Sequence, residues 1–289
     1  MEFTSNQESE NVEDRRGMKP AAVAGGGIAI LAVIIGLIFG VDKNQVAQIL
    51  GGIQNQAQVG GAGGGEGKAA DPNDPFAKFS KRLMNSLEVT WSDIFQRAGK
   101  SYEKPHMVIF SDMVSTGGCG NAPAAVGPFY CPGDKTLYLD PTFFTELEEK
   151  LGGSKADFSK AYVVAHEVGH HVQNLTGYSA KVDAKRGTRD EKQYSVRLEL
   201  QADYLAGVWA FHARKNGVIK FEDRDISEAL KTAKSIGDDV LQKRARGWAS
   251  PESYTHGTAQ QREKYFRLGL ETGDISKMKY FFDVNYNDL

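Results

Sequence analysis

The stretch AYVVAHEVGHHVQNLTG, residues 161–177, places three histidines and a glutamate in an otherwise apolar run. The apolar residues recur at the spacing of an amphipathic helix that packs against a core. Imidazole and carboxylate groups are costly to bury unless they are paired or bind a metal ion. The stretch therefore predicts a buried helix whose polar groups share a bound partner, and this requirement constrains the rest of the fold.

Two of these histidines form an HExxH pattern. His166 and His170 lie one helical turn apart, so both imidazoles project from nearly the same face, with Glu167 beside them. Zinc suits such a pair because neutral imidazoles bind it at about 2.0–2.1 Å. His171 lies about 100° further round the helix, so we do not expect it to be a ligand. The alternative is an amphipathic helix whose histidines only border a core.

A third protein ligand has to come from outside this helix. In the HExxHxxGxxH pattern the required glycine and histidine positions hold Gln173 and Thr176, so that pattern is absent. The segment LELQAD supplies Glu199 and Asp203 four residues apart, which places both carboxylates on one helical face among apolar neighbours. We expect Glu199 to ligate zinc and Asp203 to accept the free N–H of a zinc-bound histidine, His166. The alternative is that both acids lie on a solvated face.

These residues predict metal-assisted hydrolysis of amide bonds with one zinc ion per chain. The ion would lower the pKa of a bound water toward about 7, and Glu167 would accept its proton as general base. The tetrahedral oxyanion then needs a hydrogen-bond donor. His256, in a loop before the last expected helix, is the best candidate, and Tyr254 and Arg262 are weaker ones. The alternative for His256 is an ordinary surface histidine.

An apolar run without a charged residue occupies residues 21–41. A helix of this length, at about 1.5 Å per residue, just crosses a hydrocarbon core of about 30 Å. The run is longer than the apolar region of a signal peptide and no small-residue cleavage site follows it, so we expect an uncleaved single-pass anchor. Arg15, Arg16 and Lys19 precede the run, and the positive-inside rule then predicts a cytosolic tail at 1–20 and a folded domain on the other side.

The chain has two cysteines, Cys119 and Cys131, in a segment rich in glycine and proline. Their spacing is not that of a zinc knuckle or a CxxC redox pair. In an oxidising compartment we expect them to form a disulfide, which would contribute on the order of 3 kcal/mol to stability. Two unpaired thiols are the alternative.

The remaining sequence predicts a flexible glycine-rich linker at 42–70 and one folded domain at 71–289. Extended segments are expected at 106–110 and 135–140. Apolar periodicity and capping residues predict helices at 76–97, 141–153, 161–175, 194–216, 227–246 and 258–272. The expected fold is therefore α+β, dominated by helices, with a small antiparallel sheet. The net charge of -2 provides no basic surface for nucleic acid.

Five ordered segments resemble the putative neutral zinc metallopeptidases of bacteria, also called YpfJ-like: SDMVSTGGCG, GPFYCPGDKTLYLD, AYVVAHEVGHHVQNLTG, ELQADYLAGVWA and HGTAQQR. The resemblance covers nearly the whole chain. It implies a zincin-like fold of the gluzincin type, with His166, His170 and Glu199 on zinc and Glu167 as the base. It also implies that an edge strand within 135–140 pairs with an extended peptide substrate.

Together these features favour a zinc endopeptidase anchored in the bacterial cytoplasmic membrane, with its catalytic domain in the periplasm or outside the cell. A second hypothesis is a non-catalytic scaffold in which zinc staples two helices, which would require a fourth protein ligand. A third is a hydrolase of cell-wall amide bonds, which would share the metal chemistry. The sequence alone does not distinguish between these three hypotheses.

Overall fold

The computed structural model describes residues 1–17, 71 and 73–289. The expected anchor at 21–41 and the expected linker at 42–70 lie outside this part of the chain. Within the described part, no helix combines the length and the apolar character that a membrane crossing needs.

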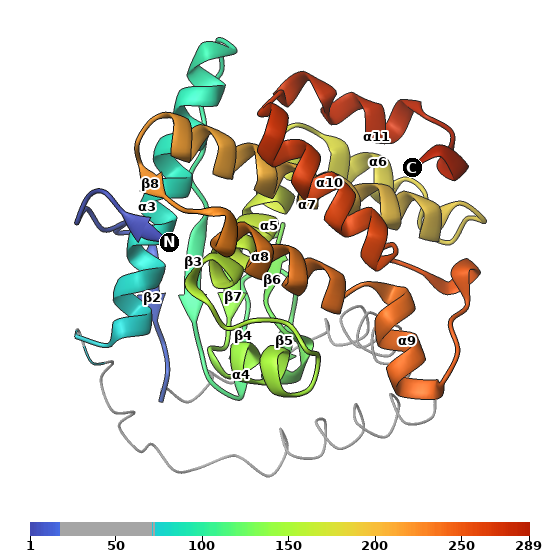
Figure 1. The fold of residues 1–289 in the computed structure, drawn as a ribbon, viewed down its shortest axis with the longest axis horizontal. Helices are drawn as coiled ribbons and strands as arrows, with labels where there is room; N and C mark the ends of the chain where they lie inside the picture. The colour runs from blue at the N-terminus through green and yellow to red at the C-terminus, as the bar shows by residue number, and fades with distance from the viewer. Residues whose placement is uncertain (18–70, 72) are drawn as a thin grey trace.

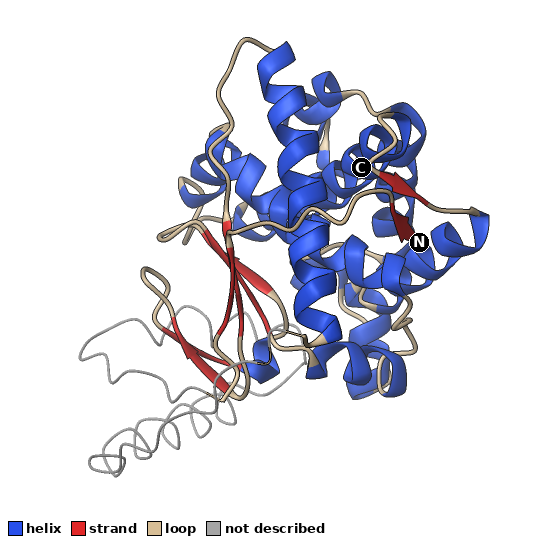
Figure 2. Cartoon of the chain, turned by 90° about the vertical axis from the view of Figure 1, so that its left-hand side faces the viewer, coloured by secondary structure: helices blue, strands red, loops and turns tan. Residues whose placement is uncertain are grey.

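The described chain is mainly helical, as expected, with most strands on one side of the helices and one short pair of strands, at the N-terminus, on the other (Figure 2). The helices are α3 (Pro75–Arg97), α4 (Thr142–Glu149), α5 (Asp157–Leu175), α6 (Tyr178–Asp183), α7 (Glu191–Lys215), α8 (Asp223–Ser235), α9 (Asp238–Arg246), α10 (Ala259–Thr272) and α11 (Tyr280–Asp283). Short 3-10 helices are η1 (Ala124–Val126), η2 (Pro251–Ser253), η3 (Ile275–Lys279) and η4 (Tyr286–Asp288). The strands are β1 (Glu2–Phe3), β2 (Val12–Asp14), β3 (His106–Ile109), β4 (Met113–Ser115), β5 (Asn121–Pro123), β6 (Phe129–Cys131), β7 (Thr136–Leu139) and β8 (Ile219–Lys220).

The main sheet has four strands in the order β2-β3-β7-β6. It is mixed, because β3 is parallel to both β2 and β7, and only β6 and β7 are antiparallel. The expectation of an antiparallel sheet is therefore wrong for the main sheet, whereas the two-stranded pairs β1–β8 and β4–β5 are antiparallel. The reason is that β6 and β7 form a hairpin, and β7 inserts beside β3 in the parallel direction. The expected edge strand at 135–140 is also corrected, since β7 lies between β3 and β6 and has no free edge.

Helix α7 lies at the centre of the helical layer and packs against α5 and α10 (Figure 1). Its large side chains Tyr204 and Trp209 are fully buried. At the crossing with α10 the two helices touch backbone to backbone: a Cβ added to Gly207 would lie 2.2 Å from the carbonyl oxygen of Phe266, and one added to Gly269 would lie 2.1 Å from that of Tyr204. The two glycines thus let the helices approach more closely than any side chain would permit.

The expected helix at 227–246 is two helices in the structure. Helix α8 ends at Ser235 and α9 begins at Asp238, with Gly237 between them in an extended conformation. A Cβ at Gly237 would lie 2.3 Å from the backbone nitrogen of Ala259, at the start of α10. The helix is interrupted here because the start of α10 packs against Gly237. Local apolar periodicity does not reveal such a tertiary contact.

Residues 1–17 contribute two strands that the sequence analysis missed. β1 pairs antiparallel with β8, and β2 forms an outer strand of the main sheet beside β3. Both strands are short, and β2 itself includes the charged residues Glu13 and Asp14, so neither shows a period-two apolar pattern.

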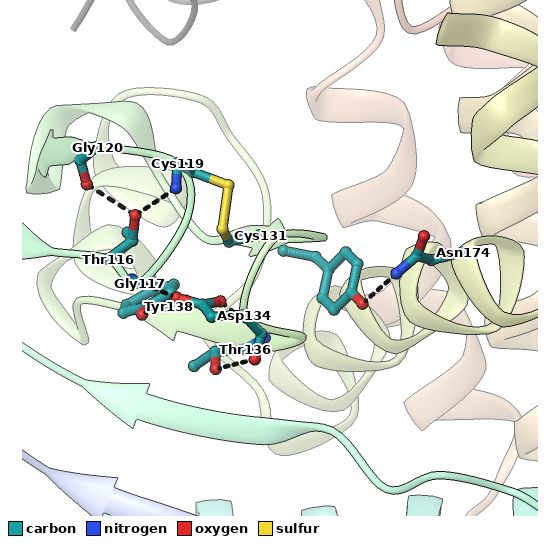
Figure 3. Close-up of a disulfide and its surroundings, with 10 residues drawn as sticks. Thr116, Gly117, Cys119, Gly120, Cys131, Asp134, Thr136, Tyr138 and Asn174 are labelled. Atoms are coloured by element: carbon teal, nitrogen blue, oxygen red, sulfur yellow. Dashed lines mark hydrogen bonds between the residues drawn. A yellow bond between two sulfur atoms is a disulfide. The ribbon is translucent and has the colours of Figure 1, made fainter. Parts of the chain in front are cut away.

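The cysteine-bearing segment is closed by a disulfide between Cys119 and Cys131, whose Cα atoms are 5.9 Å apart (Figure 3). The predicted pairing is therefore present. Asp134 stabilises the same segment, because its Oδ2 accepts hydrogen bonds from the Gly117 amide at 2.6 Å and from the Tyr138 hydroxyl at 2.7 Å. The disulfide joins the tip of this loop to β6, the outer strand nearest α5.

Candidate metal centre

The HExxH residues of α5 face α7 at a point where the two helices cross closely. Gly169, the fourth residue of HEVGH, faces Ala202 of α7, and a Cβ added to it would lie 3.1 Å from the Ala202 carbonyl oxygen. A larger side chain at this position would separate the helices. The glycine therefore allows the carboxylates of α7 to reach the histidines of α5.

Three side chains predicted as metal ligands meet at this crossing. The Nε2 atom of His166 is 3.1 Å from one carboxylate oxygen of Glu199, and the Nε2 atom of His170 is 3.5 Å from the other. One ligand atom from each of the three residues lies within 4.8 Å of the others. Ligands held about 2.0–2.2 Å from a tetrahedral zinc ion are about 3.3–3.6 Å from one another, so the donor set and the two distances to Glu199 fit zinc.

The other ring nitrogen of each histidine has a protein partner. Nδ1 of His166 lies 2.9 Å from Oδ1 of Asp203, and Nδ1 of His170 lies 2.8 Å from Oε1 of Gln173. Both partners accept a hydrogen bond, so each ring carries a proton on Nδ1 and directs Nε2 toward Glu199. Such contacts fix the orientation and tautomer of metal-binding histidines.

Asp203 is fully buried in a network that the sequence analysis did not foresee. Its Oδ1 accepts a hydrogen bond from the Tyr162 hydroxyl at 2.6 Å. Arg262 donates to Oδ2 through Nε at 2.9 Å and to Oδ1 through Nη2 at 3.0 Å. Burial alone would raise the pKa of Asp203, but Arg262 and His166 outweigh it and lower that pKa. Asp203 is therefore a carboxylate, and Arg262 is committed to it rather than free to contact substrate.

In the sequence, Gln173 only marks the point where a longer histidine pattern is absent. In the structure it is fully buried, and its amide group donates to the Leu198 carbonyl at 2.6 Å and to Oε1 of Gln201 at 2.9 Å. These bonds orient Oε1 toward His170. The signal that could have found it is an amide three residues after a metal-binding histidine, on the same helical face.

The charges of the three central groups depend on one another. Burial lowers the pKa of His166, but Asp203 and the hydrogen bond to Glu199 outweigh burial and raise it to about 10. Burial raises the pKa of Glu199, but His170 and His256 outweigh it and hold that pKa well below its ordinary value. For Glu167 burial dominates and its pKa is raised, with His170 and His166 opposing the shift. Glu167 thus has a higher proton affinity than an exposed glutamate, as a general base requires.

His256 lies in a loop that Asp238 holds in place. Oδ2 of Asp238 accepts hydrogen bonds from the backbone amides of Thr255, His256 and Gly257, at 2.7, 2.6 and 3.0 Å. The imidazole Nδ1 lies 2.9 Å from the Thr255 hydroxyl. Burial lowers the pKa of His256, but Glu199 and Asp238 outweigh burial and raise it, so the ring is close enough to Glu199 for their charges to interact. Asp238 itself gave no sequence signal, because it lies 18 residues from His256.

Two of the remaining histidines have structural partners, and the third is exposed at the start of a strand. His171 donates from Nε2 to the Glu103 carbonyl at 2.6 Å and accepts at Nδ1 from the Tyr130 hydroxyl at 2.9 Å. Burial lowers its pKa, which agrees with a neutral ring. Its partners are a loop and β6. His212 lies 2.8 Å from the Gly273 carbonyl, and His106 begins β3.

Two comparisons with known proteins bear on this site. Residues 1–281 match the sequence profile of a family described as "Putative neutral zinc metallopeptidase". The chain belongs to this family. It is 38% identical over 296 residues to the uncharacterized protein YpfJ of Escherichia coli K12, an alignment that covers 97% of this chain and 99% of that protein.

Mycobacterial relatives cover a shorter part of the chain. The uncharacterized proteins Mb2605 of Mycobacterium bovis and Rv2575 of Mycobacterium tuberculosis are each 46% identical over 198 residues, which is 66% of this chain and 65% of theirs. No solved structure matches the chain significantly. Membership of this family therefore agrees with a zinc site. The names of these relatives do not indicate a substrate.

Proposed function

We propose that this protein is a zinc endopeptidase in which His166, His170 and Glu199 hold the ion and Glu167 is the general base. The observation that carries the proposal is the convergence of two imidazoles and one carboxylate at the α5–α7 crossing. In the described part of the chain this cluster has three members, which agrees with a catalytic zinc that keeps an open position. A structural zinc would need a fourth protein ligand, so the cluster favours catalysis over a stapled scaffold.

A zinc ion in this site would acidify a bound water and polarise the carbonyl of a peptide bond. Glu167 takes the proton of the attacking water and delivers it to the leaving amine. Its half-buried position and raised pKa suit both steps. The charged network of Asp203, Arg262 and Tyr162 keeps His166 in one orientation throughout, because each of its hydrogen bonds is made in the absence of substrate.

His256 is the proposed donor to the oxyanion. Its pKa is raised, so at neutral pH the imidazole carries a proton more often than an exposed histidine. Asp238 fixes its loop through three amides and lies 3.4 Å from its Nδ1. A donor held in place before substrate arrives stabilises the developing charge without reorganising.

The proposed substrate is an extended peptide that pairs with β6. This strand is an outer member of the sheet, and its residue Tyr130 contacts His171, the neighbour of His170. An extended backbone can add to such an edge by main-chain hydrogen bonds, with specificity left to side-chain contacts. The Cys119–Cys131 disulfide supports a location outside the cytosol, where such bonds persist.

The test is cleavage of a diverse peptide library by the zinc-loaded full chain, with Glu167→Gln as the key variant. We expect this variant to bind one zinc ion as the parent does and to lose cleavage. Glu149→Gln is the matched control, because Glu149 is exposed and distant in sequence from the cluster. A chelator should abolish cleavage and added zinc should restore it. Cleavage by Glu167→Gln at the parent rate would contradict the proposal.

A further inference from the structure

Residues 1–17 are built into the sheet that supports the metal centre. β2 pairs in parallel with β3 along its whole length. The ladder continues at both ends, because the Met107 amide donates to the Asn11 carbonyl at 2.8 Å and the Arg15 amide donates to the Ile109 carbonyl at 2.7 Å. β1 makes a second, separate pairing with β8. Residues 1–17 are thus held by two strands, β3 and β8, that are distant from each other in the sequence.

A buried carboxylate fixes the segment between these two pairings. Glu88 of α3 is 3% exposed, and its Oε1 accepts hydrogen bonds from the Ser9 hydroxyl at 2.5 Å and from the Asn11 side-chain amide at 2.9 Å. Lys104 lies 3.2 Å from the other oxygen. Without residues 1–17, Glu88 would lose two of these three partners and β3 would become an uncovered edge. The segment is therefore part of the fold and not an appendage.

Two of the basic residues that precede the apolar run, Arg15 and Arg16, are engaged in the same fold. Arg15 lies 2.6 Å from Glu13, and Arg16 pairs with Asp14 and lies 2.8 Å from Asp74. Asp74 is also the N-cap of α3, where it accepts a hydrogen bond from a backbone amide. These charges have partners on the protein, so they no longer serve as a simple signal for the cytosolic side.

The contact between Arg16 and Asp74 joins the two ends of the part of the chain that the structure leaves undescribed. Nη2 of Arg16 lies 2.8 Å from Oδ1 of Asp74, so the last described residues before this part and the first ones after it are held side by side. A single crossing would instead separate them by a hydrocarbon core of about 30 Å. Paired strands are about 4.8 Å apart, so β2 and β3 cannot lie on opposite sides of a bilayer. Pairing between two copies of the chain would meet the same limit.

We propose that residues 1–17 and residues 71–289 lie on the same side of the membrane in the full-length protein, docked as β2 on β3 and β1 on β8. This excludes a single crossing between them, and it replaces the topology expected from the sequence, in which they lie on opposite sides. The inference rests on strand pairing and ion pairs, and it is independent of whether the site is a peptidase.

One experiment tests docking directly in the full-length chain. Glu2 and Lys220 are exposed partners in the β1–β8 ladder, and their Cα atoms should be about 5.5 Å apart, within reach of a disulfide. We expect Glu2→Cys with Lys220→Cys to cross-link upon oxidation of native membranes, as read by mass spectrometry of linked peptides. Glu2→Cys with Arg189→Cys, a similarly exposed pair that makes no contact in the structure, is the control. An equal yield in both pairs, or none in the first, overturns the proposal.

A second experiment reads the sides of the membrane without needing a cross-link. Asn6→Cys and Arg189→Cys each add one exposed thiol, in the N-terminal segment and in the domain. A thiol reagent that does not cross membranes is applied to intact cells and then to lysed cells. Labelling of both sites, or protection of both until lysis, supports a shared compartment. Labelling of one with protection of the other overturns it. Zinc content of each purified variant, equal to that of the parent, verifies the fold.

Discussion

His166 links the acid–base chemistry of the site to its metal affinity. The pKa of about 10 means that the metal-free protein carries a proton on this ring at neutral pH, whereas zinc requires the neutral form. Glu199 is already a carboxylate, because its pKa is held low. Zinc binding should therefore release a proton from His166.

The expected pH dependence follows from that proton. Below about pH 10 each rise of one pH unit should increase zinc affinity about tenfold per proton released. Zinc titrations by calorimetry, in two buffers that differ in ionisation enthalpy, measure the number of protons released. A value near zero at neutral pH, together with an affinity that does not change with pH, would show that His166 is neutral in the metal-free protein.

Gln173 should matter for the metal although it is not a ligand. Gln173→Leu keeps the approximate size of the side chain and removes the acceptor that orients His170, so we expect zinc affinity to fall on the order of 10–100-fold. Competition against a chelator of known affinity measures it. Gln193→Leu, at an exposed position of α7, is the control and should leave the affinity unchanged. Equal affinities in the two variants would assign Gln173 to packing alone.

At this scale the sequence predicted what lies within one helix and missed what lies between helices. The spacing of His166 and His170, and of Glu199 and Asp203, follows from helical periodicity, and the structure brings these four residues together. Arg262 is 59 residues from Asp203, and no local pattern relates them. Because its burial depends on that partner, the sequence suggested a catalytic group where the structure has an internal ion pair.

At the scale of elements, the crossing of α7 and α10 sets where Arg262 meets Asp203. The substitution Gly207→Ala tests this close crossing, because helix propensity and packing predict changes of opposite sign in the free energy of unfolding. Helix propensity alone predicts that this change stabilises the protein by about 1 kcal/mol. The added Cβ would instead lie 2.2 Å from the Phe266 carbonyl oxygen, so we expect a loss of about 1–3 kcal/mol in the free energy of unfolding. Denaturant unfolding of the metal-free protein decides between the two signs.

The disulfide is a second feature at this scale. It closes a loop with a sequence separation of 12, and its removal in Cys119→Ser with Cys131→Ser should cost on the order of 3 kcal/mol. Thermal unfolding with and without a reductant provides the measurement, and the double variant should not respond to the reductant. An equal melting temperature for the parent under both conditions would indicate that the loop is held mainly by its other contacts, such as those of Asp134.

Element positions were predictable where a single period runs without interruption, as in α3 and α10. They were not predictable where a tertiary contact decides. Gly237 interrupts an acceptable helical pattern because Ala259 lies against it, and β7 is central because β6 folds back beside it. In both cases the segment that determines the structure lies outside the short stretch of sequence over which apolar periodicity is read.

At the scale of the whole molecule, the N-terminal segment should be needed for stability. Deleting residues 1–17 leaves Glu88 with fewer partners and exposes the edge of β3, so we expect lower thermal stability and a tendency to aggregate. Ser9→Ala, which removes one bond to Glu88, should show a smaller loss of about 1 kcal/mol. Differential scanning calorimetry and light scattering provide the comparison. A deletion variant as stable and soluble as the parent would mean that the segment is dispensable.

The loop that carries His256 determines which groups can meet an anionic intermediate. All three of its consecutive backbone amides are already bound to Asp238, and so they point into the protein and away from any ligand. Enzymes that use backbone amides as an oxyanion hole need such groups free, so in this stretch only a side chain remains to do that work. Stabilisation of the charged intermediate would then depend on the protonation of a single imidazole, that of His256. This stabilisation would weaken in alkaline solution, where the imidazole loses its proton, whereas an oxyanion hole made of backbone amides would be unaffected.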